Sequence, residues 1–160
     1  MGKLFGTDGI RGMANEYPMT AEMAVRVGRA VTTVFRDGSE KPKIIVGRDT
    51  RLSGQMLESA MVAGICSAGG DAYLTGVLPT PGVAFTATAA KADAGVVISA
   101  SHNPFYDNGI KLFKGNGYKL SDKEEANVEK LILDEGLVDS SQTVGETGTV
   151  ILQDNASENY

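Results

Sequence analysis

The sequence predicts an α/β fold with three layers, α/β/α, in which helices cover both faces of a central sheet. Short runs of β-branched and other apolar residues, typical of buried strands, alternate with longer segments whose apolar residues recur at helical spacing. Such alternation favours a mostly parallel sheet with right-handed crossovers. We expect a mixed, mostly parallel sheet of four strands, with one edge strand antiparallel.

Four apolar runs are the expected strands. Residues 43–47 and 72–77 are short runs of this kind. Residues 95–100 form the central one, because they carry no charge and break abruptly into polar residues. Residues 110–113 are followed by a glycine-containing turn and a short return at 118–120, which indicates a strand, a turn and a second extended segment.

Four helices are expected between and after these strands. Thr20, Ser53 and Thr80 stand at the start of helical segments as N-cap residues. Ser121 and Glu124 have the spacing of a capping box. Glycine commonly ends helices, so the four segments are expected to run from these caps to Gly38, Gly69, about Lys91 and near Gly136.

The composition argues against several classes of protein. A net charge of −5 is unlike that of a nucleic-acid-binding surface, which needs a basic patch. No apolar run approaches the length of a membrane span, and the start of the chain lacks the apolar region of a signal peptide. The single cysteine, Cys66, leaves no internal disulfide and fits a reducing compartment. We expect a cytoplasmic protein with no nucleic-acid or membrane partner.

The sequence changes character after Val138. Residues 140–149 are polar and contain glycine, as linkers do, and residues 150–152 are an isolated apolar run. We therefore expect one domain over residues 1–138. Residues 139–160 are expected to be a linker and the truncated start of a following domain.

Two polar loops follow buried strands, where open α/β sheets bind ligands. The first begins at Arg48 and Asp49, which we expect to pair with each other and brace the loop. The second is Ser99-Ala100-Ser101-His102-Asn103-Pro104, the serine loop, in which Pro104 disfavours both helix and sheet. Ser101 lacks the Gly-x-Ser-x-Gly setting of an esterase, and no second histidine can serve as its base, so a serine hydrolase is a weak alternative.

Three motifs, in order, resemble the α-D-phosphohexomutase superfamily. They are Phe5-Gly6-Thr7-Asp8-Gly9-Ile10-Arg11-Gly12, then Gly47-Arg48-Asp49-Thr50-Arg51, then the serine loop with Asp107-Asn108-Gly109-Ile110-Lys111. Serine at position 99, where many members carry threonine, and the form of the first motif resemble the branch that acts on glucosamine phosphates. The resemblance covers nearly all of this chain but only the first of the family's four domains.

The resemblance implies an enzyme that works through a phosphoserine, and Ser101 would be that residue. Ser101 would carry a phosphoryl group, donate it to a hexose monophosphate, and recover a different one from the resulting bisphosphate. Arg11 would face phosphate, Lys111 would exchange a proton with the sugar, and His102 would orient the phosphate or the sugar. The expected catalytic residues are Ser101, Arg11, His102 and Lys111, and the expected substrate-binding residues are Thr7 and Asn103.

The resemblance also implies cofactors and partners. Mg²⁺ would take one oxygen of phosphorylated Ser101, with its other ligands outside this chain, because no Asp-Gly-Asp-x-Asp motif occurs. A hexosamine 1,6-bisphosphate would be the intermediate and activator, in a reaction that serves amino-sugar nucleotide and cell-wall precursor synthesis. The partners would be the sugar-phosphate substrate, the remaining domains of a longer enzyme and, in a homodimer, a second copy. Without the remaining domains, this chain is expected to be inactive.

Two alternatives remain open at this point. A member of the same superfamily that acts on mannose or glucose phosphates would share all three motifs. A stand-alone phosphate-binding or interaction module is the alternative from a different class, because the metal-binding motif is missing from these 160 residues.

Overall fold

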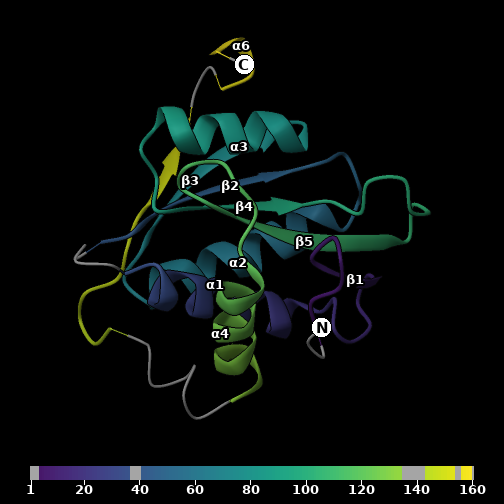
Figure 1. Ribbon diagram of the computed structural model, residues 1–160, viewed down its shortest axis with the longest axis horizontal. Helices are drawn as coiled ribbons and strands as arrows, with labels where there is room; N and C mark the ends of the chain where they lie inside the picture. The colour runs from purple at the N-terminus through teal and green to yellow at the C-terminus, as the bar shows by residue number, and fades with distance from the viewer. Residues whose placement is uncertain (1–3, 37–40, 135–142, 154–155, 160) are drawn as a thin grey trace.

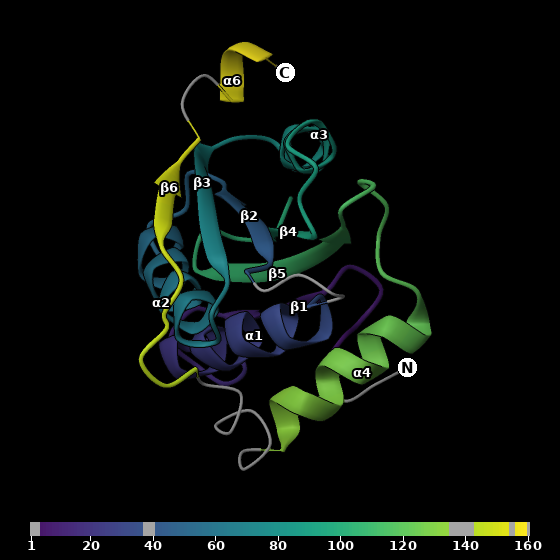
Figure 2. The ribbon, with the colours of Figure 1, turned by 90° about the vertical axis from the view of Figure 1, so that its left-hand side faces the viewer.

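A six-stranded sheet forms the middle layer of the described structure, and helices cover both of its faces (Figures 1 and 2). The computed structural model describes residues 4–36, 41–134, 143–153 and 156–159. The strands lie in the order β1-β5-β4-β2-β3-β6 and comprise β1 Ile10–Met13, β2 Lys43–Arg48, β3 Asp71–Val77, β4 Ala94–Ile98, β5 Asp107–Lys114 and β6 Val150–Leu152. The helices are α1 Ala21–Val34, α2 Gly54–Ser67, α3 Thr80–Ala89, α4 Asp122–Leu133 and α6 Ala156–Asn159.

The sheet confirms the predicted fold class. Strands β4, β2, β3 and β6 are parallel, and β5 pairs antiparallel to β4 at one side of them. The expected number of four strands was wrong, because the short β1 pairs with β5 on its outer side and the short β6 pairs with β3. β1 carries an arginine and a glycine among four residues, so it lacks the apolar run that marks the other strands.

Two layers of apolar core lie on the two faces of the sheet. One packs against α1, α2 and α4 and includes Ile44, Val46 and Ile98, whereas the other packs against α3 and includes Ile45 and Val97. Neighbouring residues of a strand point to opposite faces. Strands β2 and β4 are therefore buried on both faces, which is why their sequences are continuous apolar runs.

Two helix starts agree with the sequence and two differ. The Thr20 hydroxyl accepts a hydrogen bond from the Met23 N–H, and Ser121 with Glu124 forms the predicted capping box at α4. Ser53 precedes α2 but does not cap it with its side chain. The N-cap of α3 is Pro79, because the residue predicted for that role already lies within the helix.

Three of the four predicted helix ends lie beyond the helices that the structure shows. Helix α1 ends at Val34, α3 at Ala89 and α4 at Leu133. The expected stops at Gly38 and Gly136 lie outside the described residues. Helix α2 ends at Ser67, just before Gly69, which has a φ of 84°.

The chain reverses its path across the sheet between β2 and β4. It moves from β2 through α2 to β3, then returns through α3 past β2 to β4. Both connections are crossovers between parallel strands, which are right-handed. Because the two crossovers run in opposite directions across the sheet, their helices α2 and α3 lie on opposite faces of it (Figure 2). The loops that follow β2 and β4 meet at this switch point, where α/β sheets commonly bind ligands.

Candidate functional site

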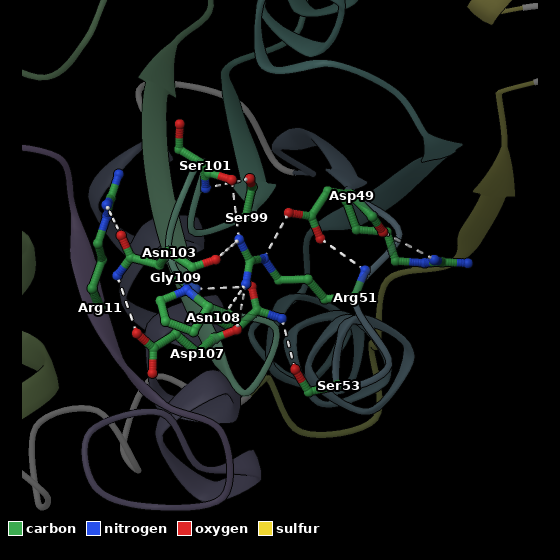
Figure 3. A network of polar contacts seen from close by, with 12 residues as sticks. Arg11, Asp49, Arg51, Ser53, Ser99, Ser101, Asn103, Asp107, Asn108 and Gly109 are labelled. Atoms are coloured by element: carbon green, nitrogen blue, oxygen red, sulfur yellow. Dashed lines mark hydrogen bonds and ion pairs between the residues drawn. The ribbon is translucent and has the colours of Figure 1, made fainter.

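The serine loop leaves the carboxyl end of β4 and holds Ser101 in an uncommon backbone conformation. The φ of Ser101 is 56°, in the left-handed region that residues other than glycine seldom occupy. Its N–H donates to Oγ of Ser99 at 3.1 Å, and its carbonyl oxygen accepts from Nη2 of Arg51 at 3.0 Å. The residue is exposed, and its hydroxyl points away from these bonds (Figure 3). The backbone of Ser101 is thus bound on both sides, while its hydroxyl is left accessible.

Arg51 reaches the serine loop from the loop after β2. Its side chain is 10% exposed, and its two terminal nitrogens donate to four backbone carbonyl oxygens. Nη2 binds Ser101 at 3.0 Å and Asn103 at 2.9 Å, and Nη1 binds Asp107 at 3.1 Å as well as Pro104 (Figure 3). One side chain therefore fixes the path of the chain from Ser101 to the start of β5.

Asp49 orients Arg51. Its carboxylate accepts from the backbone N–H of Arg51 at 3.1 Å and from Nε at 3.0 Å. The predicted pairing of the Asp49 and Arg48 side chains is wrong, because Arg48 forms its ion pair with Glu58 of α2, with Nε 3.5 Å from the carboxylate. Burial raises the pKa of Glu58, and the charge of Arg48 opposes that rise.

Arg11 approaches the serine loop from β1, on the other side. Its Nη1 donates to Oδ1 of Asn103 at 2.9 Å, and Nδ2 of Asn103 donates to Oδ2 of Asp107 at 3.2 Å. The other terminal nitrogen of Arg11 lies 3.7 Å from the Asp8 carboxylate. Two predicted site residues, Arg11 and Asn103, are thus in direct contact beside Ser101 (Figure 3).

The base of the loop is held by a buried amide and a close backbone approach. Nδ2 of the fully buried Asn108 donates to the Ser53 hydroxyl at 2.8 Å, so this hydroxyl binds β5 and not the N–H groups at the start of α2. The Oδ1 of Asn108 accepts from the N–H of Gly109 at 2.8 Å. A Cβ at Gly109 would lie 2.6 Å from the carbonyl oxygen of Ser99, so only glycine fits here.

An open hollow of about 550 Å³ lies beside Ser101. It is lined by residues 49–52 and by Ser101, Asn103 and Phe105. Leu52 and Phe105 are 97% and 85% exposed on its rim. A ligand in this hollow would meet Ser101 and Asn103 from the loop after β4.

The other three predicted site residues lie outside this hydrogen-bond network. His102 is exposed in the serine loop. Lys111 is half-buried on β5, where it is paired with Val97 of β4. Arg11 is paired with Gly109, two residues before Lys111. Because every second residue of a strand points to the same face, the side chains of Arg11 and Lys111 lie on one face of the sheet. Thr7 is exposed and lines a separate hollow of about 520 Å³ beside α4.

The described residues do not form a magnesium site by themselves. Among them, no group of three or more His, Cys, Asp and Glu side chains is arranged to hold a metal ion. The two carboxylates near Ser101 already have partners, since Asp49 binds Arg51 and Asp107 binds Asn103. Within the described ranges, the prediction that a phosphate oxygen on Ser101 binds the metal therefore has no carboxylate cluster beside it.

Arg51 and Asn108 are the site residues that sequence reasoning missed. Arg51 ends the second of the three motifs, in which the sequence assigns a role only to Arg48 and Asp49. The usable signal was its place after a strand next to β4, because neighbouring parallel strands end at the same edge. Nothing in the local pattern distinguishes the fully buried Asn108 from a surface turn residue.

Comparisons with known proteins give a consistent family. A profile of the family described as "Phosphoglucomutase/phosphomannomutase, alpha/beta/alpha domain I" matches residues 2–138. Phosphoglucosamine mutase from Syntrophus aciditrophicus (strain SB) is 56% identical over 160 residues, covering 100% of this chain and 36% of the relative. The protein of the same name from Syntrophobacter fumaroxidans is 60% identical over 148 residues, covering 92% of this chain and 33% of the relative.

A solved structure gives the same result for the fold. The chain resembles a phosphoglucomutase/phosphomannomutase family protein from Burkholderia thailandensis with a TM-score of 0.79 and 28% sequence identity. The match covers 98% of this chain and 34% of that one. The chain spans about a third of the length of the curated relatives it matches.

Proposed function

This chain belongs to the phosphoglucomutase/phosphomannomutase family as its α/β/α domain I, and from this premise we propose that it is the catalytic-serine domain of a phosphoglucosamine mutase. The complete protein would interconvert glucosamine 6-phosphate and glucosamine 1-phosphate. The high identity to two relatives of that name supports the choice of sugar. Residues 1–138 would be the family domain, and residues 139–160, of which Val150–Leu152 adds a strand to its sheet, would lead towards the next one.

The observation that carries the proposal is the state of Ser101. Its backbone is bound on both sides while its hydroxyl is exposed at the switch point of the sheet. In the proposed cycle, the phosphoryl group leaves Oγ of Ser101 for the free O1 or O6 hydroxyl of the sugar monophosphate; that hydroxyl loses its proton and Oγ takes one up. The bisphosphate then returns its other phosphoryl group to Oγ, which loses its proton, and the sugar oxygen that is freed takes one up.

Arg11 and Lys111 have a defined task in this proposal. A phosphoserine carries about −1.5 to −2 charges at neutral pH, and the transferring group needs positive charge around it. With a net charge of −5, the chain must supply that charge locally. Arg11 is directed to the loop through Asn103, and Lys111 on the same face would exchange the proton with the sugar hydroxyl.

The remaining contacts would form only in the complete protein. His102 and Thr7 would contact the phosphate or sugar once the other domains close on this one. Magnesium, whose role would be to neutralise phosphate charge, would need ligands from outside this chain. The partners would be a sugar phosphate, those further domains and, in a homodimer, a second copy.

The proposed location is the cytoplasm. Cys66 is a free thiol in the structure, which agrees with a reducing compartment. Among the described helices, none combines the length and apolar character needed to cross a bilayer.

The test uses the full-length protein that carries this sequence. Peptide mass spectrometry of protein isolated from cells should find phosphate on Ser101, and Ser101→Ala should abolish mutase activity. Phosphate found only on Ser99, or full activity in Ser101→Ala, would overturn the assignment.

A phosphomannomutase or phosphoglucomutase is the second candidate. It is favoured by the structural match to a protein of the phosphoglucomutase/phosphomannomutase family. The ratio of kcat/KM for glucosamine, mannose and glucose 6-phosphates separates the candidates. Loss of all three activities in phosphorylated full-length protein would favour a phosphate-binding module instead.

A further inference from the structure

We propose that Arg51 is a positioning residue for Ser101, which acts by fixing the serine loop and not by placing its charge on the transferring phosphate. The inference rests on the proposed function, since it assigns a role within the Ser101 phosphoryl cycle. It concerns a side chain that contacts no reacting atom, so Arg51 would influence the reaction only through the backbone it holds.

The hydrogen-bond inventory of Arg51 is the first argument. A guanidinium has five N–H groups in a fixed planar fork. Here Nε donates to Asp49, each terminal nitrogen donates to two carbonyl oxygens of residues 101–107, and these bonds account for all five. A lysine at this position could offer at most three donors from a single nitrogen, so it could not reproduce the arrangement.

The charge of Arg51 is the second argument. The Asp49 carboxylate lies 3.0 Å from Nε and neutralises the guanidinium locally. With every N–H donor engaged, none remains for a phosphate on Ser101. Arg11 differs, because its Nε is buried without a hydrogen-bond partner among the described residues, and only one of its terminal nitrogens is hydrogen-bonded. The two arginines beside the loop therefore have different tasks.

The backbone of Ser101 is the third argument. A left-handed conformation at a residue other than glycine persists only where its surroundings impose it. At Ser101 the imposing groups are the Ser99 hydroxyl on the N–H and Arg51 on the carbonyl oxygen. Without Arg51 the loop would relax towards negative φ and carry the hydroxyl with it. A displacement of about 1 Å can cost about 100-fold in rate.

This role has a consequence that general destabilisation does not share. The bisphosphate intermediate must return a phosphoryl group to Ser101 before it dissociates. If Ser101 is misplaced, the return is slower and more of the bisphosphate escapes in each turnover. The variant would then lose its phosphoserine during the reaction and depend more strongly on added bisphosphate.

The experiment compares full-length wild-type protein with Arg51→Lys, Asp49→Asn and Arg48→Lys. Arg48→Lys is the matched control, because Arg48 ends the same strand but pairs with Glu58 and makes no bond to residues 101–107. For each we would measure kcat and KM for glucosamine 6-phosphate, free bisphosphate released per turnover, and stimulation by added glucosamine 1,6-bisphosphate. Hydrogen exchange at residues 101–107 reports on the loop without reference to activity.

We expect Arg51→Lys to lower kcat about 10- to 100-fold, with KM within about twofold of wild type. Bisphosphate release, stimulation by bisphosphate and hydrogen exchange at residues 101–107 should all rise. Asp49→Asn, which leaves Arg51 in place but loosens its orientation, should shift the same quantities less. Arg48→Lys should match wild type in release and in loop exchange.

Each contrary outcome has a distinct meaning. Wild-type kcat in Arg51→Lys would show that retained charge is sufficient and would overturn the positioning role. Reduced kcat with unchanged release per turnover and unchanged loop exchange would also overturn it, as a loss of folded protein. If Arg51→Lys does not fold, then unchanged bisphosphate release and unchanged hydrogen exchange at residues 101–107 in Asp49→Asn would overturn the positioning role. Inactive wild-type phosphoprotein would defeat the proposed function itself.

Discussion

At the scale of single residues, the strain at Ser101 has a measurable cost. Ser101→Gly should raise the free energy of unfolding of the 160-residue chain by about 0.5–1 kcal/mol, because glycine adopts a φ of 56° without strain. The larger entropy of glycine in the unfolded chain offsets part of that gain. Urea unfolding measures the difference. Ser101→Ala is the control, because alanine keeps the strain, so its stability should not rise.

Arg11 and Lys111 give the second prediction. In full-length protein, Arg11→Met and Lys111→Met should each lower kcat/KM by about 10- to 1000-fold, or about 1.4–4 kcal/mol, if each removes a charge-assisted contact to the transferring group. Lys123→Met, at an exposed position on α4, should change it little. Equal small effects at all three positions would show that neither cation faces the phosphate.

At the scale of elements, two glutamates should shift stability with pH in opposite directions. The Ser121 N–H at the start of α4 holds the pKa of Glu124 below its ordinary 4.5, so the stability it contributes is present above pH 4.5 and lost as pH falls through the lowered pKa. Burial raises the pKa of Glu58 above 4.5, so the folded state binds that proton more tightly, and stability falls as pH rises from 4.5 through the raised pKa.

Unfolding of the 160-residue chain across pH 3–7 tests both signs. Glu124→Gln should flatten the acid side of the profile, because the titrating group is gone. Glu58→Gln should flatten the fall on the other side of pH 4.5. If both substitutions change the same side, one of the two assigned environments is wrong.

The elements also show what the sequence can and cannot predict. Strands β2 and β4 were predicted from their apolar runs, because burial on both faces leaves its mark on every residue. Strand β1 was missed because its pairing with β5 depends on backbone geometry, and an arginine and a glycine interrupt its apolar residues. In the same way, the contact between Arg51 and residues 101–107 exists only after β2 and β4 lie side by side.

At the scale of the whole molecule, the chain should fold alone but not work alone. Capped helices and two core layers around one sheet make a self-consistent unit. We expect one cooperative thermal transition and no shift in Tm on adding millimolar Mg²⁺. We also expect no isomerisation of glucosamine 6-phosphate, because the other domains would be needed to orient the substrate, which is worth up to about 7–11 kcal/mol of the barrier. Turnover by purified residues 1–160 that Ser101→Ala abolishes would contradict this.

The pairing of β6 with β3 means that the sheet extends beyond the last residue matched by the family profile. The profile ends at residue 138, yet the Ala72 N–H donates to the Thr149 carbonyl oxygen, and Val150–Leu152 covers the outer side of β3. A chain cut at residue 138 would leave that side of β3 without a partner. Unpaired strand edges recruit other chains, so a protein cut at the family boundary should self-associate more strongly than the 160-residue chain.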